Sequence, residues 1–71
     1  MATITPKKLL KFLKARGFYV HHQVGSHIAL KSHKDPSKRI TLPMHNKDLN
    51  PKTISSILQQ AGIARKELFR N

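Results

Sequence analysis

The side chain in this sequence best suited to move a proton is His27, in the stretch "QVGSHIAL" at residues 23–30. An imidazole titrates near ~6.5, so it can accept or donate a proton at neutral pH. Gly25 and Ser26 precede it, and they offer a close backbone approach and a hydroxyl donor. A three-residue match of this kind is frequent by chance, so a solvated turn histidine is the competing interpretation.

Cleavage of RNA without a metal would use such a group. It needs a base for the 2′-hydroxyl, an acid for the leaving oxygen, and cations near the phosphorus. The chain has three acidic residues, Asp35, Asp48 and Glu67, in three different segments, so neither a two-metal site nor paired catalytic carboxylates are expected. It has no cysteine and no phosphate-binding glycine motif, and its histidine spacing does not suit zinc. We therefore expect no metal and no cofactor.

The other four histidines have different expected positions. His21 and His22 are adjacent in a segment that alternates like a strand, so we expect them to face opposite sides of a sheet. They and His33 are interpreted as polar surface residues. His45 lies in a loop before a helix cap, and such a loop histidine could lie beside His27 at a sheet edge.

Positive charge dominates the composition. Fourteen lysines and arginines give a formal net charge of +11, and such a field attracts polyanions, above all nucleic acid. A solubilising surface or an acidic protein partner is the alternative. The basic residues that we expect to contact RNA are Lys7, Lys8, Lys11, Lys31, Lys38 and Arg39.

The chain shows neither a run of about 20 apolar residues nor the pattern of a signal peptide. We expect a cytoplasmic protein without membrane contact, and the absence of cysteine is compatible with a reducing compartment.

The elements that would position these groups follow from caps and periodicity. Residues 1–71 are expected to form a single domain with a thin core. Thr5 and Pro6 begin a helix that Gly17 ends, and Asn50 and Pro51 begin a second that Gly62 ends. Between them, period-two alternation predicts strands at 18–24, from residue 28 onward, and at 39–43, and "ARKELF" predicts a short final helix. This order predicts an α+β fold, with a three-stranded antiparallel sheet and helices on one face.

The turn before His27 determines where its ring points. A two-residue loop, Gly25-Ser26, would place Val24 opposite His27 and separate the apolar side chains. A three-residue turn that includes His27 would gather Val20, Val24, Ile28 and Leu30 on one face. We therefore expect the longer turn, with His27 at its edge or pointing away from the core.

Four segments together resemble the HicA toxin family, small RNA-cleaving proteins of bacterial and archaeal toxin–antitoxin pairs. They are "KKLLKFLKARGF", "GSHIAL", "RITLPMHNKDL" and "ISSILQQAGIARKELF", in this order and spacing over nearly the whole chain. The resemblance implies a double-stranded-RNA-binding-domain-like fold, α-β-β-β-α, which agrees with the order predicted from periodicity.

The resemblance also implies a function. His27 matches the catalytic histidine of the family; many members carry a second histidine directly after it, where this chain has Ile28. Pro43 to His45 match the Pro-x-His segment of the family, so His45, like Gly25 and Ser26, is an auxiliary candidate. The implied activity is metal-independent cleavage of mRNA, which arrests translation and is neutralised by a cognate HicB-type antitoxin. A non-catalytic RNA-binding module and a basic protein that binds an acidic partner are the alternatives.

Overall fold

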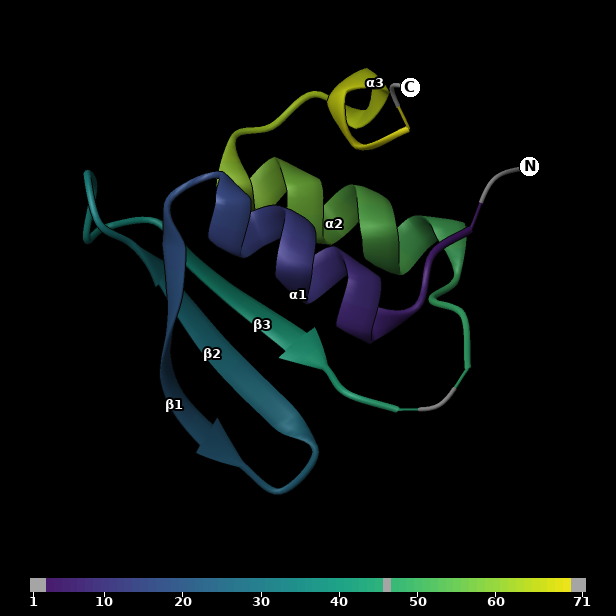
Figure 1. Ribbon diagram of the computed structural model, residues 1–71, viewed down its shortest axis with the longest axis horizontal. Coiled ribbons are helices and arrows are strands. Elements are labelled where there is room, and N and C mark those ends of the chain that lie inside the picture. The colour runs from purple at the N-terminus through teal and green to yellow at the C-terminus, as the bar shows by residue number, and fades with distance from the viewer. Residues whose placement is uncertain (1–2, 46, 70–71) are drawn as a thin grey trace.

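The computed structural model describes residues 3–45 and 47–69, and it has the predicted order of elements (Figure 1). The elements are α1 (Pro6–Ala15), β1 (Phe18–Val24), β2 (His27–Ser32), β3 (Arg39–Pro43), α2 (Pro51–Ala61) and α3 (Arg65–Leu68). The strands form an antiparallel sheet of order β1-β2-β3, and the two long helices lie on one side of it (Figure 1). The α+β prediction is therefore confirmed.

Both long helices begin at the caps expected from the sequence. The Thr5 hydroxyl accepts a hydrogen bond from the Lys8 backbone N–H at 3.3 Å. The Asn50 carboxamide oxygen accepts one from the Thr53 N–H at 3.0 Å. A proline stands in the first turn of each helix, where a missing N–H costs nothing.

The second helix ends at Gly62, whose φ of 72° is the left-handed conformation that glycine adopts without strain. The Ile63 N–H then donates to the Leu58 carbonyl at 3.0 Å, which satisfies one of the last helical acceptors. This ending directs the chain back over the helices toward α3 (Figure 1).

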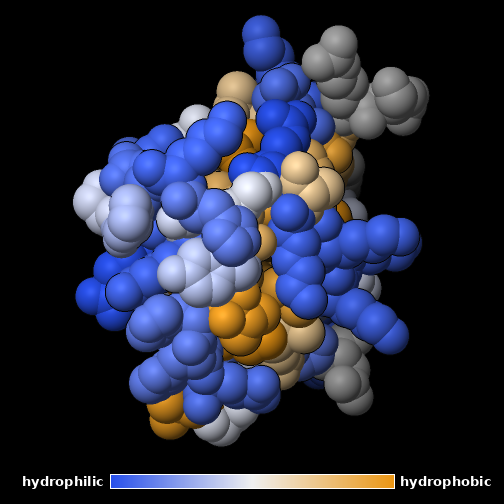
Figure 2. Space-filling model, turned by 60° about the vertical axis from the view of Figure 1, so that its left-hand side comes forward, coloured by the Kyte–Doolittle hydropathy of each residue, from blue (hydrophilic) through white to orange (hydrophobic). Residues whose placement is uncertain are grey.

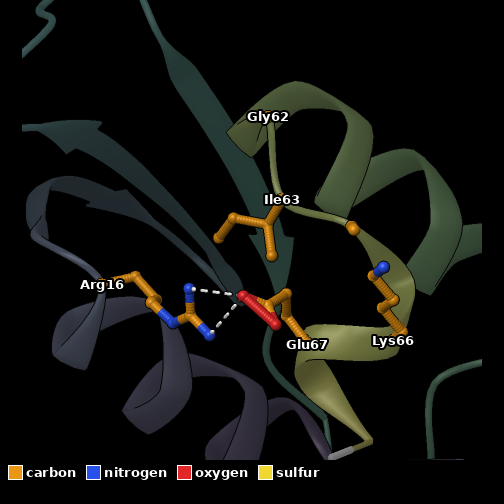
Figure 3. Close-up of a pocket in the computed structure, with 6 residues that line it drawn as sticks. Arg16, Gly62, Ile63, Lys66 and Glu67 are labelled. Atoms are coloured by element: carbon orange, nitrogen blue, oxygen red, sulfur yellow. Dashed lines mark hydrogen bonds and ion pairs between the residues drawn. The ribbon is translucent and has the colours of Figure 1, made fainter.

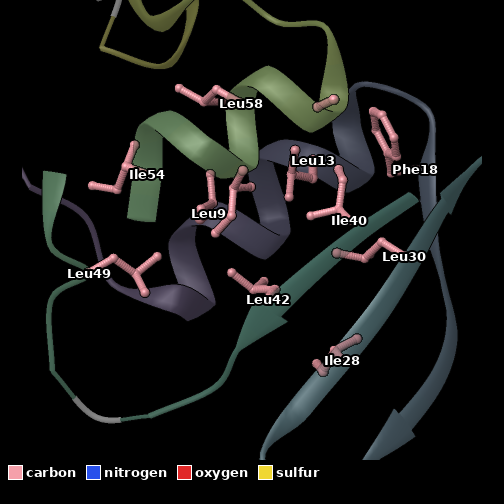
Figure 4. Packing of buried hydrophobic residues seen from close by; sticks show 12 residues of the cluster. Leu9, Leu13, Phe18, Ile28, Leu30, Ile40, Leu42, Leu49, Ile54 and Leu58 are labelled. Atoms are coloured by element: carbon pink, nitrogen blue, oxygen red, sulfur yellow. The ribbon is translucent and has the colours of Figure 1, made fainter. Parts of the chain in front are cut away.

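The core lies between the helices and one face of the sheet (Figure 4). Leu9 and Leu13 of α1 lie between the long helices and the strands, which contribute alternate residues such as Ile40 and Leu42. The buried hydrophobic side chains are Leu9, Leu13, Phe18, Ile28, Leu30, Ile40, Leu42, Leu49, Ile54, Ile57, Leu58 and Ala61.

None of the described helices lies on the other face of the sheet, which we call the open face. In Figure 1, α1 and α2 lie together on one side of the sheet, and the turn of the β1–β2 hairpin extends past them. Along β2, Ile28 and Leu30 are buried, whereas His27 is exposed and Ala29 is only partly covered. The open face is therefore the surface to which His27 belongs.

The surface seen from the β1 side is mostly hydrophilic, with small hydrophobic areas between (Figure 2). Among the described residues, the exposed large hydrophobic side chains are Val20 and Val24. No helix within residues 3–45 and 47–69 is both long and apolar enough to cross a membrane.

Candidate active site on the open face of the sheet

His27 is the first residue of β2 and lies fully within the antiparallel ladder. Its backbone is opposite Val24 on β1 and Pro43 on β3. The side chain is exposed, and within the described part of the chain it makes no hydrogen bond or ion pair. His27 thus lies outside the core, as the sequence predicted.

The turn that leads to His27 is shorter than predicted. Gly25 and Ser26 form a two-residue loop, and Val24 pairs directly with His27. Gly25 has a φ of 57°, and Ser26 does not have positive φ, which fits the type II′ turn that favours glycine at its first central position. The prediction of a three-residue turn was wrong, and Val24, at 65% exposure, lies outside the core.

A β-bulge in β1 makes the shorter turn compatible with a buried apolar face. Val20 pairs with Leu30 and His22 pairs with Ala29, so His21 is an extra residue on β1. This insertion reverses the in-and-out alternation in the rest of β1. Gln23 is therefore on the core side, opposite Ile28, and Val24 is on the open face, opposite His27. The bulge therefore supplies the extra residue that was expected in a three-residue turn.

The bulge also corrects the positions of His21 and His22, which were expected on opposite faces. Their rings are nearly parallel, at 8°, with centroids 6.1 Å apart. His22 pairs with the open-face residue Ala29, and His21 is close enough to Lys31 and Arg39 for both cations to affect its pKa. Both imidazoles therefore lie on the open face with His27.

The register places a group of polar side chains around the small residue Ala29. Ala29 pairs with His22 on β1 and with Thr41 on β3, and His27 and Lys31 are two residues away on β2. All four longer side chains project from the same face because residues i and i+2, and directly paired residues, share a face. We call His22, His27, Lys31 and Thr41 the open-face cluster.

One cation, Lys31, belongs to this cluster, and a second lies beside it. Lys31 pairs with Arg39 across β2 and β3, so two of the six predicted RNA-contacting residues share the face of His27. The pKa of His21 is lowered, first by the Lys31 ammonium and then by partial loss of hydration, His22 and Arg39. The paired residues Lys31 and Arg39 therefore concentrate positive charge on this face, which suits an anionic ligand.

The other predicted RNA-contacting residues lie elsewhere. Lys7, Lys8 and Lys11 are exposed on α1, in the layer on the opposite side of the sheet. The Lys38 ammonium lies against Gly62, and a Cβ atom placed on that glycine would be only 2.8 Å from it. Lys38 thus faces the C-terminal end of α2, where a cation is favourable.

His45, the expected auxiliary, is not in the open-face cluster. Its Nδ1 accepts a hydrogen bond from the Lys47 backbone N–H at 3.3 Å. Its side chain lines a shallow cleft with Thr5, Lys7 and Met44, on the helix side of the sheet. The segment begins near Ser26, whose carbonyl accepts from the Met44 N–H at 2.6 Å, but within the described residues His45 and His27 share no hydrogen bond or ring contact.

The three carboxylates are engaged away from His27. Asp35 accepts from the hydroxyl and backbone N–H of Ser37 in the turn after β2, which lowers the pKa of the Asp35 carboxyl. Asp48 accepts from the Thr3 hydroxyl at 2.8 Å. Within residues 3–45 and 47–69, no three His, Asp or Glu side chains are grouped so as to hold a metal ion.

A cleft of about 720 Å³ lies between the end of α1 and α3, and it has different chemistry (Figure 3). Arg16 and Glu67 line it and form an ion pair at 3.4 Å. Its lining, among the residues that the structure describes, contains no histidine. The ion pair joins α3 to the helix layer, so we assign the cleft to packing rather than to catalysis.

The chain matches a family model described as the HicA toxin of bacterial toxin–antitoxin systems, over residues 6–63. It belongs to the HicA toxin family. No curated protein gives a significant match. The match covers both long helices and all three strands, so the candidate site lies within the family domain. As a member of this family the chain is a toxin, and membership of a toxin–antitoxin family implies an antitoxin partner.

Two features of the HicA open face were missed in the sequence. His21 and His22 were assigned to the surface without a role because strict period-two alternation separates them. Thr41 was not singled out, since its place beside Ala29 depends on the pairing of β2 with β3. The adjacent histidines were the available signal, but only the bulge brings them together.

Proposed function

We propose that this HicA toxin is a metal-independent endoribonuclease and that His27 transfers a proton in the cleavage step. The observation that carries the proposal is the position of the ring, which is exposed on the open face, without a hydrogen bond among the described residues. A residue needed only to finish a turn would not require a neighbouring group of imidazoles and cations.

In the proposed reaction the RNA 2′-oxygen attacks the adjacent phosphorus, and the bond from phosphorus to the 5′-oxygen breaks. One group takes the proton of the 2′-hydroxyl, and another gives a proton to the departing 5′-oxygen. The products are a 2′,3′-cyclic phosphate and a free 5′-hydroxyl. Lys31 and Arg39 would stabilise the added negative charge on the phosphorane.

Gly25 and Ser26 act in this proposal by positioning His27. The Ser26 carbonyl is bonded to the Met44 N–H, which joins the turn to the end of β3. The Ser26 side chain is exposed beside His27 and can donate a hydrogen bond to a phosphate oxygen. The tight turn thereby holds the first residue of β2 in place.

Independence from metal is supported by the carboxylates, which are few and engaged at sites away from His27. Cleavage should persist in excess chelator and leave cyclic phosphate ends. Activity that is lost in chelator and restored by magnesium, with 5′-phosphate products, would contradict this mechanism.

The proposed substrate is mRNA in the cytoplasm, and its cleavage would arrest translation. The proposed partner is a HicB-type antitoxin that covers the open face around His27. A chain of this size has little surface for a remote regulatory site, and a net charge of +11 favours an acidic partner surface.

A non-catalytic RNA-binding module is the second candidate. It is favoured by the fold and by the exposed lysines of α1, because double-stranded-RNA-binding domains hold duplexes through phosphate contacts without chemistry. This candidate predicts binding of RNA without any cleavage, whether or not His27 is present.

Replacement of His27 by Ala tests the proposal. We expect cleavage to fall by about 10²–10⁴-fold, the usual contribution of a positioned acid or base. Stability should change by less than about 0.5 kcal/mol, since the side chain is exposed and makes no hydrogen bond among the described residues. Labelled-RNA cleavage and thermal unfolding measure the two effects, with His33→Ala as a control for loss of an exposed histidine.

Equal cleavage by the parent and His27→Ala would contradict the catalytic assignment. Early melting with loss of RNA binding would instead show that His27 is a structural residue.

A further inference from the structure

Cleavage by 2′-hydroxyl attack needs two proton transfers on opposite sides of one phosphorus atom, and His27 can perform only one of them at a time. The second group must lie on the same face, within reach of the same phosphate. His45 does not meet this condition, because its side chain lines a cleft with Thr5 and Lys7 on the helix side. The second group must therefore be another titratable side chain on the open face.

His22 occupies the position diagonal to His27 on the open face. It pairs with Ala29, which is two residues from His27 on β2. Diagonal neighbours in an antiparallel pair are separated by about 7–8 Å, and long or ring side chains reach across that distance. Ala29 carries a single methyl group, so it leaves the space above the sheet to the two imidazoles.

The bulge is what gives His22 this position. In a regular ladder continued from the Val20–Leu30 pair, His21 would be opposite Ala29 and His22 would turn toward the core side. Insertion of one residue brings both imidazoles to the open face. Bulges are enriched beside active sites, where they redirect a side chain, and this one redirects a histidine toward His27.

The titratable and charged side chains that face this region come from the three strands and from His33, directly after β2. They are Tyr19, His21 and His22 from β1, His27 and Lys31 from β2, and Arg39 from β3, with the His33 ring 4.5 Å from that of Tyr19. No described helix covers them. His21 lies toward the Lys31 and Arg39 cations, whereas His22 lies diagonal to His27.

We propose that His22 is the second proton-transfer group of this enzyme and acts across the scissile phosphate from His27. One imidazole accepts the proton of the 2′-hydroxyl as the 2′-oxygen bonds to phosphorus. The other donates its proton to the 5′-oxygen as that bond breaks, so atoms and charge balance. This inference rests on the proposed endoribonuclease function and adds a residue to it.

The test compares the parent with His22→Ala, His22→Gln and His27→Ala in single-turnover RNA cleavage across a range of pH. His21→Ala reports on the neighbouring ring of the bulge, and His33→Ala is the control for an exposed histidine that follows the end of β2 and lies outside the open-face cluster. RNA affinity and melting temperature are measured for every variant. The Gln variant keeps a polar side chain in case the Ala variant disturbs the strand.

We expect both His22 variants to fold, to bind RNA like the parent, and to cleave about 10²–10⁴-fold more slowly. The pH profile of the parent should be bell-shaped, and each of His22→Ala and His27→Ala should lose one limb. His21→Ala should lose much less activity, and its profile should keep both limbs.

A second substrate identifies the acid. When a sulfur replaces the bridging 5′-oxygen, the leaving thiolate needs no proton, so a variant without the acid recovers cleavage and a variant without the base does not. Recovery by one of His22→Ala and His27→Ala, but not the other, supports the paired assignment whichever one it is.

Cleavage by both His22 variants within threefold of His21→Ala, or a loss confined to RNA affinity with both pH limbs intact, would overturn the inference and leave His27 as the catalytic group. A parent that does not cleave RNA would instead overturn the proposed function itself. The two failures are therefore distinguishable within one series.

Discussion

The Lys31 ammonium is the main cause of the lowered pKa of His21. Lys31→Met should therefore raise the pKa of His21 toward its ordinary value of 6.5, because the protonated ring would lose its strongest repulsion. NMR titration of the imidazole carbon-bound protons measures this directly. Lys11→Met, which removes a lysine from the exposed side of α1, is the matched control.

The same effect has a consequence for stability. A histidine with a folded-state pKa below its unfolded value binds fewer protons when folded, so stability is lost as pH falls from 6.5 toward the folded pKa. Lys31→Met should weaken this pH dependence. If the His21 titration is the same in the parent and in both variants, Lys31 does not face that ring, and the positions assigned to the open face would be wrong.

At the scale of elements, both helices could be predicted closely because their ends are determined locally. A capping side chain, a proline in the first turn and a following glycine act within a few residues of one another. These signals are local, so they do not depend on contacts with distant parts of the chain. The same holds for the strands, since the buried residues Ile28, Leu30, Ile40 and Leu42 alternate with small or polar residues that are less buried.

The geometry of the β1–β2 hairpin could not be predicted in this way. The alternation requires one extra residue somewhere between Val20 and Ile28, but it does not say where. We placed that residue in the turn, whereas the structure places it at His21. Every residue from His21 to Val24 is exposed, so burial gives no preference between the two solutions. The composition of the candidate site depends on this choice.

The hairpin turn provides a test of the observed geometry. Gly25 has positive φ, and a Cβ added there meets no atom within 4 Å, so Ala at this position is penalised by conformation alone. We expect Gly25→Ala to lower the free energy of unfolding by about 1–2 kcal/mol. D-alanine, introduced by chemical synthesis, should avoid this loss because its chirality favours positive φ.

Urea denaturation of the two proteins measures the difference. They have the same side chain at the same site and differ only in its handedness. Equal stability of the L-Ala and D-Ala proteins would show that the backbone at Gly25 does not have positive φ in solution, and the two-residue turn would then be incorrect.

At the scale of the whole molecule, basic residues lie on both sides of the sheet. Lys31 and Arg39 are on the open face, whereas Lys7 and Lys11 are on the exposed side of α1. Composition could predict that the chain binds a polyanion, but it could not choose a side, because the net charge of +11 belongs to the whole chain. Catalysis by His27 requires RNA to lie on the open face.

The dependence of RNA affinity on salt can identify that face. Each phosphate contact to single-stranded RNA contributes a slope of about −0.7 in log affinity against log salt concentration. Replacement of both Lys31 and Arg39 by Met should therefore make the slope shallower by about 1.4, whereas Lys7→Met with Lys11→Met should leave it nearly unchanged. Fluorescence anisotropy with 2′-O-methyl RNA, which lacks the attacking hydroxyl, separates binding from cleavage.

Equal losses of slope in both pairs of variants would mean that RNA contacts both the sheet and the helix layer. A loss confined to the α1 pair would place RNA away from His27, and the catalytic assignment would then have to be withdrawn.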